Sequence, residues 1–274
     1  MSEADINQAL TRLREVIRAV ESAVLAYSGG VDSTLVAAVT HEELGGRVLA
    51  VTIDNALYPQ WQAEDASRIA ADIGIRHEVI RVDALAVDGV SENTPYRCYH
   101  CKLFIFGKLR RIAEREGLAA VLDGANADDP HDHRPGLRAA EELGVISPLR
   151  ETGITKAMVR NLSRRLGLPT ADKPAFACLA SRIPYGLRIT PERLEMVRQA
   201  EDYLHSLGLM QYRVRHHDTI ARIEVPPDAI AKLTEPEVRE GLVSAFKRIG
   251  YTYLTLDLEG FRSGSMNAVL PDGQ

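Results

Sequence analysis

The chain has 274 residues, of which 45% are hydrophobic and 26% are charged, a balance typical of a soluble globular protein with room for one large domain or two modest ones. Its 33 basic and 38 acidic residues give a formal net charge of −5, which argues against a general nucleic-acid binder. No apolar run reaches the ~18 residues that a membrane span needs, no signal-peptide pattern opens the sequence, and three cysteines exclude a framework of paired disulfides. We expect a cytoplasmic protein with reduced thiols that binds neither nucleic acid nor membrane.

Hydrophobic patterning in the first part of the chain alternates between short apolar runs and amphipathic segments. Apolar runs predict buried strands at 23–27 and 48–53, and further strands are expected at 77–82 and 120–122. The amphipathic segments predict helices at 5–21, 31–44, 60–73, 101–116, 137–143 and 155–166. Strands that alternate with helices predict an α/β fold, a parallel sheet with helices on both faces. Ligands bind such sheets at the carboxyl ends of the strands.

The pattern changes near Leu168. Residues 168–191 contain four prolines and little periodicity, which predicts a linker or active-site loop. The remainder predicts a small α+β unit with helices at 191–207 and 235–249 and strands at 211–216, 220–225 and 251–257. We therefore expect a nucleotide-binding domain over 1–167, a cysteine-bearing loop over 168–190, and a substrate-binding or oligomerisation domain over 191–274.

A glycine-containing loop, Ser28–Ser33, follows the first predicted strand and opens a helix. Its glycines allow a tight turn, and the helix N-terminus offers unpaired N–H groups to an anion. The loop lacks the Gly-Lys-Ser/Thr of a Walker motif. The alternative is an ordinary strand-to-helix turn with incidental glycines. The candidate phosphate-binding residues are Ser28, Gly29, Gly30, Asp32 and Ser33.

A second polar segment, Asp123–Asp129, follows the fourth predicted strand. We expect Gly124 and Asn126 to contact a nucleotide. Either Asp128 or Asp129 would bind Mg²⁺, which prefers carboxylates and ATP oxygens. The alternative is a cluster of turn and helix-capping residues.

The three cysteines allow four interpretations. Cys98 and Cys101 lie three residues apart at the start of a predicted helix, and Cys178 lies in the proline-rich segment. They suit a zinc site with a fourth ligand from His100, His131 or His133, a redox dithiol of the first two, or a [4Fe–4S] cluster with one open iron. In the fourth, Cys178 is merely a small buried residue.

Basic residues in the last part of the chain suit an anionic substrate. Arg213 and Arg215 alternate on one face of a predicted strand, and two guanidinium groups on one face make a good phosphate clamp. Arg182, four residues after Cys178, is placed to hold an anion near the sulfur. The alternative is a solvated sheet edge with arginines paired to Glu201 or Glu224; Glu201 could equally bind a cation.

The hexapeptide Ser28–Ser33 resembles the signature of the PP-loop ATP pyrophosphatases, whose domain is of the adenine nucleotide alpha hydrolase type. The resemblance implies that ATP is split between its α and β phosphates, that the loop holds pyrophosphate with Asp32 in a catalytic role, and that the substrate is adenylated. It also places Asp54 near the nucleotide, although a turn or helix-capping role is the alternative.

The chain as a whole resembles the LarE family of ATP-dependent sulfur transferases. That family makes pyridinium-3,5-bisthiocarboxylic acid mononucleotide, the organic part of the nickel-pincer cofactor of lactate racemase. The resemblance implies a pyridinium dicarboxylate mononucleotide as substrate, bound by Arg182, Arg213, Arg215 and Glu201, and a homo-oligomer. The matching stretches are 28–33, 97–102, 123–129, 133–136, 147–149, 178–186 and 213–225.

The LarE resemblance allows two sulfur sources. One branch of the family sacrifices the sulfur of a single loop cysteine, which here would be Cys178 acting as nucleophile. The other has three cysteines, matched by Cys98, Cys101 and Cys178, and is thought to bind a [4Fe–4S] cluster that delivers a hydrosulfide. The three-cysteine pattern favours the cluster.

Three rival functions remain. A PP-loop tRNA thiolase also uses paired cysteines, but the acidic net charge counts against an RNA surface. An amide-forming synthetase of the NAD or GMP type would leave the cysteines without a role. A nucleotide-sensing or cluster-carrying scaffold would bind ATP without releasing AMP and pyrophosphate.

Overall fold

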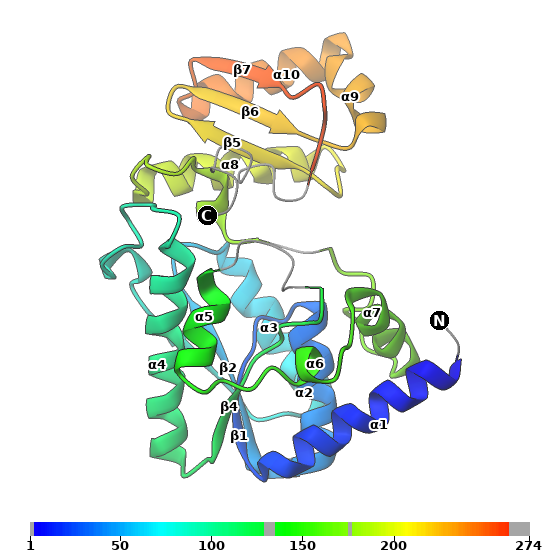
Figure 1. Ribbon diagram of the computed structural model, residues 1–274. Helices are drawn as coiled ribbons and strands as arrows, with labels where there is room; N and C mark the ends of the chain where they lie inside the picture. The colour runs from blue at the N-terminus through cyan, green and yellow to red at the C-terminus, as the bar shows by residue number, and fades with distance from the viewer. Residues whose placement is uncertain (1–2, 129–134, 175–176, 263–274) are drawn as a thin grey trace. The chain divides into compact units, whose positions relative to one another are not determined.

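The computed structural model describes residues 3–128, 135–174 and 177–262, and the chain divides into two compact units (Figure 1). The first unit comprises Met1–Gly89 and Pro95–Phe176, and the second comprises Val90–Thr94 and Ala177–Gln274. The division falls inside the segment expected to be a loop. Five residues from the first part of the sequence belong to the second unit, which no sequence pattern predicted. Within the described parts of the chain, every helix is too short or too polar to span a bilayer.

The first unit is built on a parallel four-stranded sheet in the order β3-β2-β1-β4. The strands are β1 (Ala23–Ala26), β2 (Val48–Asp54), β3 (His77–Arg81) and β4 (Ala120–Leu122). The helices are α1 (Glu3–Val20), α2 (Val31–Leu44), α3 (Gln60–Ile73), α4 (Arg97–Glu116), α5 (Pro135–Glu142), α6 (Pro148–Glu151) and α7 (Lys156–Arg165), with short 3₁₀ turns at Gly45–Arg47 and Ala84–Ala86. The predicted α/β fold is confirmed.

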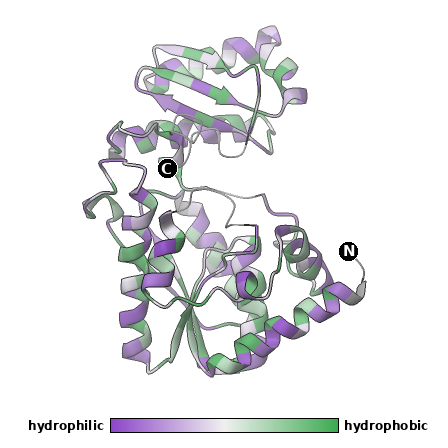
Figure 2. Ribbon diagram, viewed as in Figure 1, coloured by the Kyte–Doolittle hydropathy of each residue, from purple (hydrophilic) through white to green (hydrophobic). Residues whose placement is uncertain are grey.

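Alternating residues of β1, β2 and β4 face two separate hydrophobic cores, so this part of the sheet is covered on both faces. Leu25 of β1 packs in one core with residues of α1, α2 and α7, whereas Val24 packs in the other with residues of α4 and α5. Side chains of a strand alternate between faces, so a strand buried on both sides must be apolar at every position. Figure 2 shows these strands coloured as hydrophobic.

Helix α4 begins at Arg97 rather than at Cys101, where the sequence predicted its start. The polar residues at 97–100 hide this extra turn from hydrophobic periodicity, but Arg97 is buried. Pro95 lies outside the helix, and Tyr96 is its N-cap. Both Cys98 and Cys101 therefore lie within the first turns of a helix.

The second unit has a three-stranded sheet in the order β5-β6-β7, with β5 antiparallel and β7 parallel to β6. The sequence analysis did not predict helix α9, which lies between β6 and α10. A single residue separates α9 from α10, and each of these two helices has proline at its N-terminus. The strands are β5 (Arg213–His217), β6 (Ile220–Glu224) and β7 (Tyr253–Leu256), and the helices are α8 (Pro191–Ser206), α9 (Pro227–Thr234), α10 (Pro236–Ile249) and a 3₁₀ turn at Leu179–Arg182. Residues of α8, α10 and the three strands form a core of their own.

Candidate functional site

The loop Ser28–Ser33 joins the end of β1 to the start of α2, as the sequence predicted. Gly29 has φ of +66°, and a Cβ atom there would lie 2.9 Å from Cα of Ala66 in α3. A side chain at this position would meet both backbone strain and a collision with α3. Gly30 is the N-cap of α2, so the unpaired N–H groups of the first helical turn lie at this loop.

Hydroxyl groups hold the loop in shape. The Oγ atom of Ser33 lies 3.1 Å from Oγ of Ser28 and donates to the carbonyl of Gly30 at 3.2 Å. The backbone N–H of Gly30 donates to Oγ of Ser28 at 3.3 Å. These contacts place both predicted serines in the loop itself, where their hydroxyls can turn toward a bound anion.

A cavity of about 130 Å³ opens at this loop. Its walls come from the loop, from α3, from the start of α7 and from the segment that leads to Cys178. The lining residues are Ser28, Gly30, Val31, Asp32, Gln62, Lys156, Lys173 and Pro174. Two ammonium groups and a helix N-terminus around one cavity favour a polyanion such as a pyrophosphate group.

Lys156 is the first residue of α7, and its ammonium group forms an ion pair with Oδ2 of Asp32. The other carboxylate oxygen of Asp32 accepts a hydrogen bond from Nδ2 of Asn126 at 3.2 Å. The structure thus brings two predicted site residues, Asp32 and Asn126, into direct contact, and it adds a lysine from a distant segment.

Lys173 reaches the same loop from the proline-rich segment. Its Nζ atom donates to the carbonyl of Gly29 at 2.8 Å and forms an ion pair with Asp65 of α3. Burial by itself would raise the pKa of Asp65, but hydrogen bonds from Lys173 and Arg68 outweigh it and lower that pKa. Both lysines are therefore held beside the cavity by carboxylates.

Neither lysine was singled out from the sequence. One signal was available for Lys156, because it follows the helix N-cap Thr155 and a positive charge at a helix N-terminus is unfavourable unless something else requires it. Lys173 lies in a segment without periodicity, so its proximity to Gly29 comes from tertiary folding alone.

The segment after β4 packs directly on the phosphate loop. A Cβ atom at Gly124 would lie 2.9 Å from the backbone N of Ser33, so only glycine allows this close approach. Asn126 is buried. Asp128 is exposed and accepts a hydrogen bond from the backbone N of Lys156 at 2.7 Å, a contact of the helix-capping kind that was the alternative to Mg²⁺ binding. Asp129 lies outside the described residues.

Asp54 does not line the cavity. It ends β2, and its carboxylate pairs with Nε of Arg81, its register partner on β3, at 3.0 Å. Its expected place near the nucleotide stays a prediction.

The three cysteines are thiols rather than halves of disulfides. Cys98 and Cys101 belong to the first unit and Cys178 to the second. Cys98 is exposed, Cys101 and Cys178 are partly exposed, and Nη2 of Arg97 lies 3.9 Å from the sulfur of Cys98. Among the described residues no group of three or more metal-binding side chains comes together, so the cluster stays a prediction. His131 and His133, the other suggested zinc ligands, fall outside these residues.

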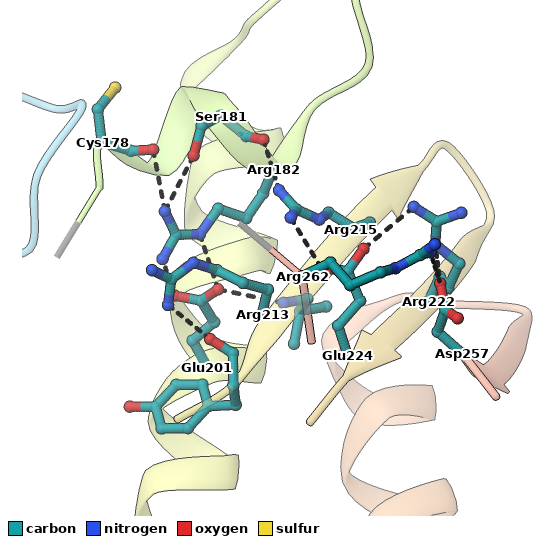
Figure 3. A network of polar contacts seen from close by, with 12 residues as sticks. Cys178, Ser181, Arg182, Glu201, Arg213, Arg215, Arg222, Glu224, Asp257 and Arg262 are labelled. Atoms are coloured by element: carbon teal, nitrogen blue, oxygen red, sulfur yellow. Dashed lines mark hydrogen bonds and ion pairs between the residues drawn. The ribbon is translucent and has the colours of Figure 1, made fainter. Parts of the chain in front are cut away.

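Arg182 anchors the turn that carries Cys178 (Figure 3). Its side chain is only 1% exposed and forms a two-pronged ion pair with Glu201 of α8, at 2.8 and 2.9 Å. Its Nη1 atom donates to the carbonyl of Ala177 at 2.7 Å and to that of Cys178 at 3.1 Å. Such a paired and buried guanidinium group fixes the backbone at Cys178.

The other predicted arginines lie in the same network. Arg215 donates to the carbonyl of Ser181 at 2.9 Å and pairs with the buried Glu224 at 2.7 Å (Figure 3), a pairing that was the alternative to phosphate binding. Burial, with the positive charge of Arg182 next in importance, lowers the pKa of Arg213 to about 10. Arg213 therefore stays protonated at neutral pH.

The chain is similar to several known proteins. The NAD synthase family model matches residues 5–94. The chain is 45% identical over 262 residues to an uncharacterized protein of Synechocystis sp., with 95% of this chain and 97% of that protein covered. It is 30% identical over 240 residues to an uncharacterized protein of Methanocaldococcus jannaschii, with 88% of this chain and 90% of that protein covered.

A further relative covers both units. Over 259 residues the chain is 38% identical to the pyridinium-3,5-bisthiocarboxylic acid mononucleotide synthase of Lactiplantibacillus plantarum, with 94% of this chain and 93% of that protein covered. A phosphate loop of the expected geometry and a buried arginine network at Cys178 accompany this likeness. The chain belongs to the family of pyridinium-3,5-bisthiocarboxylic acid mononucleotide synthases, the LarE family.

Proposed function

We propose that this chain is an ATP-dependent sulfur transferase that acts on pyridinium-3,5-biscarboxylic acid mononucleotide. A substrate carboxylate oxygen attacks the α-phosphorus of ATP, the bond to the β-phosphate oxygen breaks, and pyrophosphate leaves. A sulfur nucleophile then attacks the acyl carbon, the bond to AMP breaks, and the sulfur loses its proton to leave a thiocarboxylate. Adenylation serves the second step because AMP is a good leaving group. The observation that carries the proposal is the similarity, over 94% of the chain, to the pyridinium-3,5-bisthiocarboxylic acid mononucleotide synthase of Lactiplantibacillus plantarum.

The cavity at Ser28–Ser33 supports the first half of this reaction. Its helix N-terminus and the ammonium groups of Lys156 and Lys173 suit the charge of the departing pyrophosphate. In the structure these lysines pair with Asp32 and Asp65. We propose that the phosphates of bound ATP replace these carboxylates as partners of the two ammonium groups. The carboxylate of Asp32 could then bind Mg²⁺.

The donor set of three thiols supports sulfur chemistry in the second half. Cys98, Cys101 and Cys178 are thiols that are at least partly exposed, which fits soft ligands of iron. A [4Fe–4S] cluster bound there would supply a hydrosulfide that coordination keeps deprotonated at neutral pH. If Cys178 instead gives up its own sulfur, its thiolate attacks the acyl carbon and AMP leaves. A base then removes the Cα proton as the Cβ–S bond breaks, which releases the thiocarboxylate and leaves dehydroalanine at position 178.

The arginine network supports an anionic substrate. Arg182 and Arg215 are nearly fully buried and occupied with Glu201 and Glu224, so they hold the binding surface in place. Arg213 is less buried, and we propose that its guanidinium group contacts the substrate phosphate.

Product analysis of anaerobically prepared protein tests the proposal. With ATP and the dicarboxylate, we expect equal amounts of AMP and pyrophosphate together with a thiocarboxylate detected by mass spectrometry. Asp32→Ala and Lys156→Gln should each lower AMP formation at least tenfold, because both act at the cavity. Asp72→Asn, on the exposed side of α3, should change nothing. ATP cleavage without any thiocarboxylate would refute sulfur transfer.

The same experiment distinguishes the sulfur sources. Loss of the elements of H₂S from the polypeptide after one turnover would identify Cys178 as sacrificial. An unchanged polypeptide mass, with iron–sulfur absorption that Cys98→Ala, Cys101→Ala or Cys178→Ala each abolishes, is the result expected for the cluster.

A further inference from the structure

The segment Val90–Thr94 is separated from the rest of the second unit by more than eighty residues of sequence, yet it belongs to that unit. It lies alongside the residues that follow Cys178. The backbone N–H of Gly186 donates to the carbonyl of Asn93 at 3.0 Å, and that of Ile189 donates to the carbonyl of Ser91 at 2.8 Å. We call Val90–Thr94 the strap.

Asn93 is the central residue of this contact. It is fully buried, with 0% exposure, and it has φ of +57°. Asparagine tolerates this left-handed conformation better than most residues do. Its Nδ2 atom lies within hydrogen-bond distance of the carbonyls of Ile183, Pro184 and Leu187, at 3.2, 2.7 and 2.9 Å.

The contacted carbonyls belong to a single turn, which includes Pro184 and Gly186, the latter with φ of +83°. Three carbonyl oxygens that converge on one point repel one another and need a donor, because burial separates them from water. The amide group of Asn93 supplies that donor from outside the turn. A carboxylate of the same size would have none to offer at neutral pH.

The Cys178 turn, residues 177–187, is therefore fastened at both ends. Arg182 binds the carbonyls of Ala177 and Cys178 at its start, as Figure 3 shows for Cys178. Asn93 binds the carbonyls at its end. The backbone N–H of Ser181 also donates to the carbonyl of Cys178 at 2.9 Å.

We propose that Asn93 is a positioning residue that fixes the Cys178 turn and so holds the Cys178 thiol where sulfur transfer requires it. The expected effect of Asn93 on sulfur transfer rests on the proposed function, whereas its expected effect on the position of the Cys178 thiol does not. Loss of the Asn93 amide should leave adenylation intact, because that step uses the phosphate-loop cavity of the other unit. It should allow the thiol to move, so that adenylated substrate is lost to water before sulfur reaches it.

Three variants separate the amide group from the backbone conformation. Asn93→Asp keeps the size of the side chain but turns the donor into an acceptor. Asn93→Gly removes the donor while keeping the left-handed backbone accessible. Ser91→Ala is the matched control on the strap, because it removes only the 3.4 Å contact between Ser91 Oγ and Nη2 of Arg188 and leaves the backbone bond to Ile189.

The first measurement is alkylation of the whole protein with iodoacetamide, read peptide by peptide by mass spectrometry. We expect both Asn93 variants to raise the alkylation rate of Cys178 at least fivefold, with the rate of Cys98 unchanged, and Ser91→Ala to match the parent protein. Unchanged alkylation of Cys178 in both Asn93 variants would overturn the proposal, whether or not the protein transfers sulfur.

The second measurement is the yield of thiocarboxylate per AMP released. We expect the Asn93 variants to lower this yield at least fivefold with the KM for ATP unchanged, a split that a general loss of structure would not produce. Hydrogen exchange should increase over 183–187 but not in β6 or α8. If protection is lost throughout the second unit, Asn93 is a folding residue and the positioning role is rejected.

Discussion

At the scale of single residues, the site depends on charges that are held in place before any ligand arrives. Asp32 and Asp65 each fix one lysine beside the phosphate-loop cavity. Two ammonium groups left without partners would repel each other and lose their positions, whereas paired groups are oriented at little cost when the ligand binds. This arrangement could not be found from local sequence, because each pair joins residues more than one hundred positions apart.

A prediction at this scale concerns pH. His216 follows Arg215 on β5 and is 1% exposed; burial, followed by the charge of Arg193, lowers its pKa to about 4. In the unfolded chain His216 is protonated below about pH 6.5, whereas in the folded chain it stays neutral down to about pH 4. The free energy of unfolding therefore decreases as the pH falls from about 6.5 to about 4. We expect the free energy of unfolding to lose on the order of 1 kcal/mol from this residue between pH 7 and 5.5.

Urea denaturation at a series of pH values checks this expectation. His216→Gln should show a smaller decrease between pH 7 and 5.5 than the parent protein. His205→Gln, at an exposed position of α8, serves as control and should follow the parent curve. Equal pH dependence in all three proteins would contradict the assignment.

At the scale of elements, the predicted helices and strands of the first unit are found with small shifts at their ends, since most are marked by periodicity and by glycine or proline near a boundary. Helix α9, which has eight residues and proline at its N-terminus, was not predicted. The start of α4 was missed because its first turn is polar. Neither omission changes the sheet, but the second brings Cys98 into the same helix as Cys101.

The packing of the β4 end on the start of α2 gives a prediction at this scale. In Gly124→Ala the new methyl group would lie 2.9 Å from the backbone N of Ser33, too close for an undisturbed contact. This N–H is one of the amide groups of the phosphate loop. Gly124→Ala should therefore weaken ATP binding at least tenfold, as measured by isothermal titration calorimetry. Gly107→Ala is a matched control, because nothing lies within 4 Å of its new methyl group and helix α4 should gain about 0.5–1 kcal/mol. ATP binding that Gly124→Ala leaves intact would separate this contact from the site.

At the scale of the whole molecule, each unit has a hydrophobic core of its own. Leu35 of α2 is fully buried in a core of the first unit, and Leu204 of α8 is fully buried in the core of the second. A buried leucine truncated to alanine destabilises its surroundings by about 2–5 kcal/mol. The loss of stability should remain within the unit that carries the substitution.

This prediction uses a matched pair of substitutions. Leu35→Ala should reduce hydrogen-exchange protection in α1 and α2 while β6 and α10 keep theirs, and Leu204→Ala should do the reverse. Native-state hydrogen exchange read by mass spectrometry distinguishes the two patterns. Equal loss of protection in both units for either variant would show a single cooperative structure instead.

The sequence by itself determined the parallel α/β fold, the position of the phosphate loop and the residues around Cys178, because these features depend on local patterning and on glycines and cysteines at fixed spacings. Only the tertiary structure decided that Lys156 and Lys173 reach the phosphate loop, that Arg182 is occupied with Glu201, and that Asn93 fastens the Cys178 turn. The physical reason is that ion pairs and buried hydrogen bonds join side chains that are near in space, and nothing in one segment of sequence records which distant segment will fold against it.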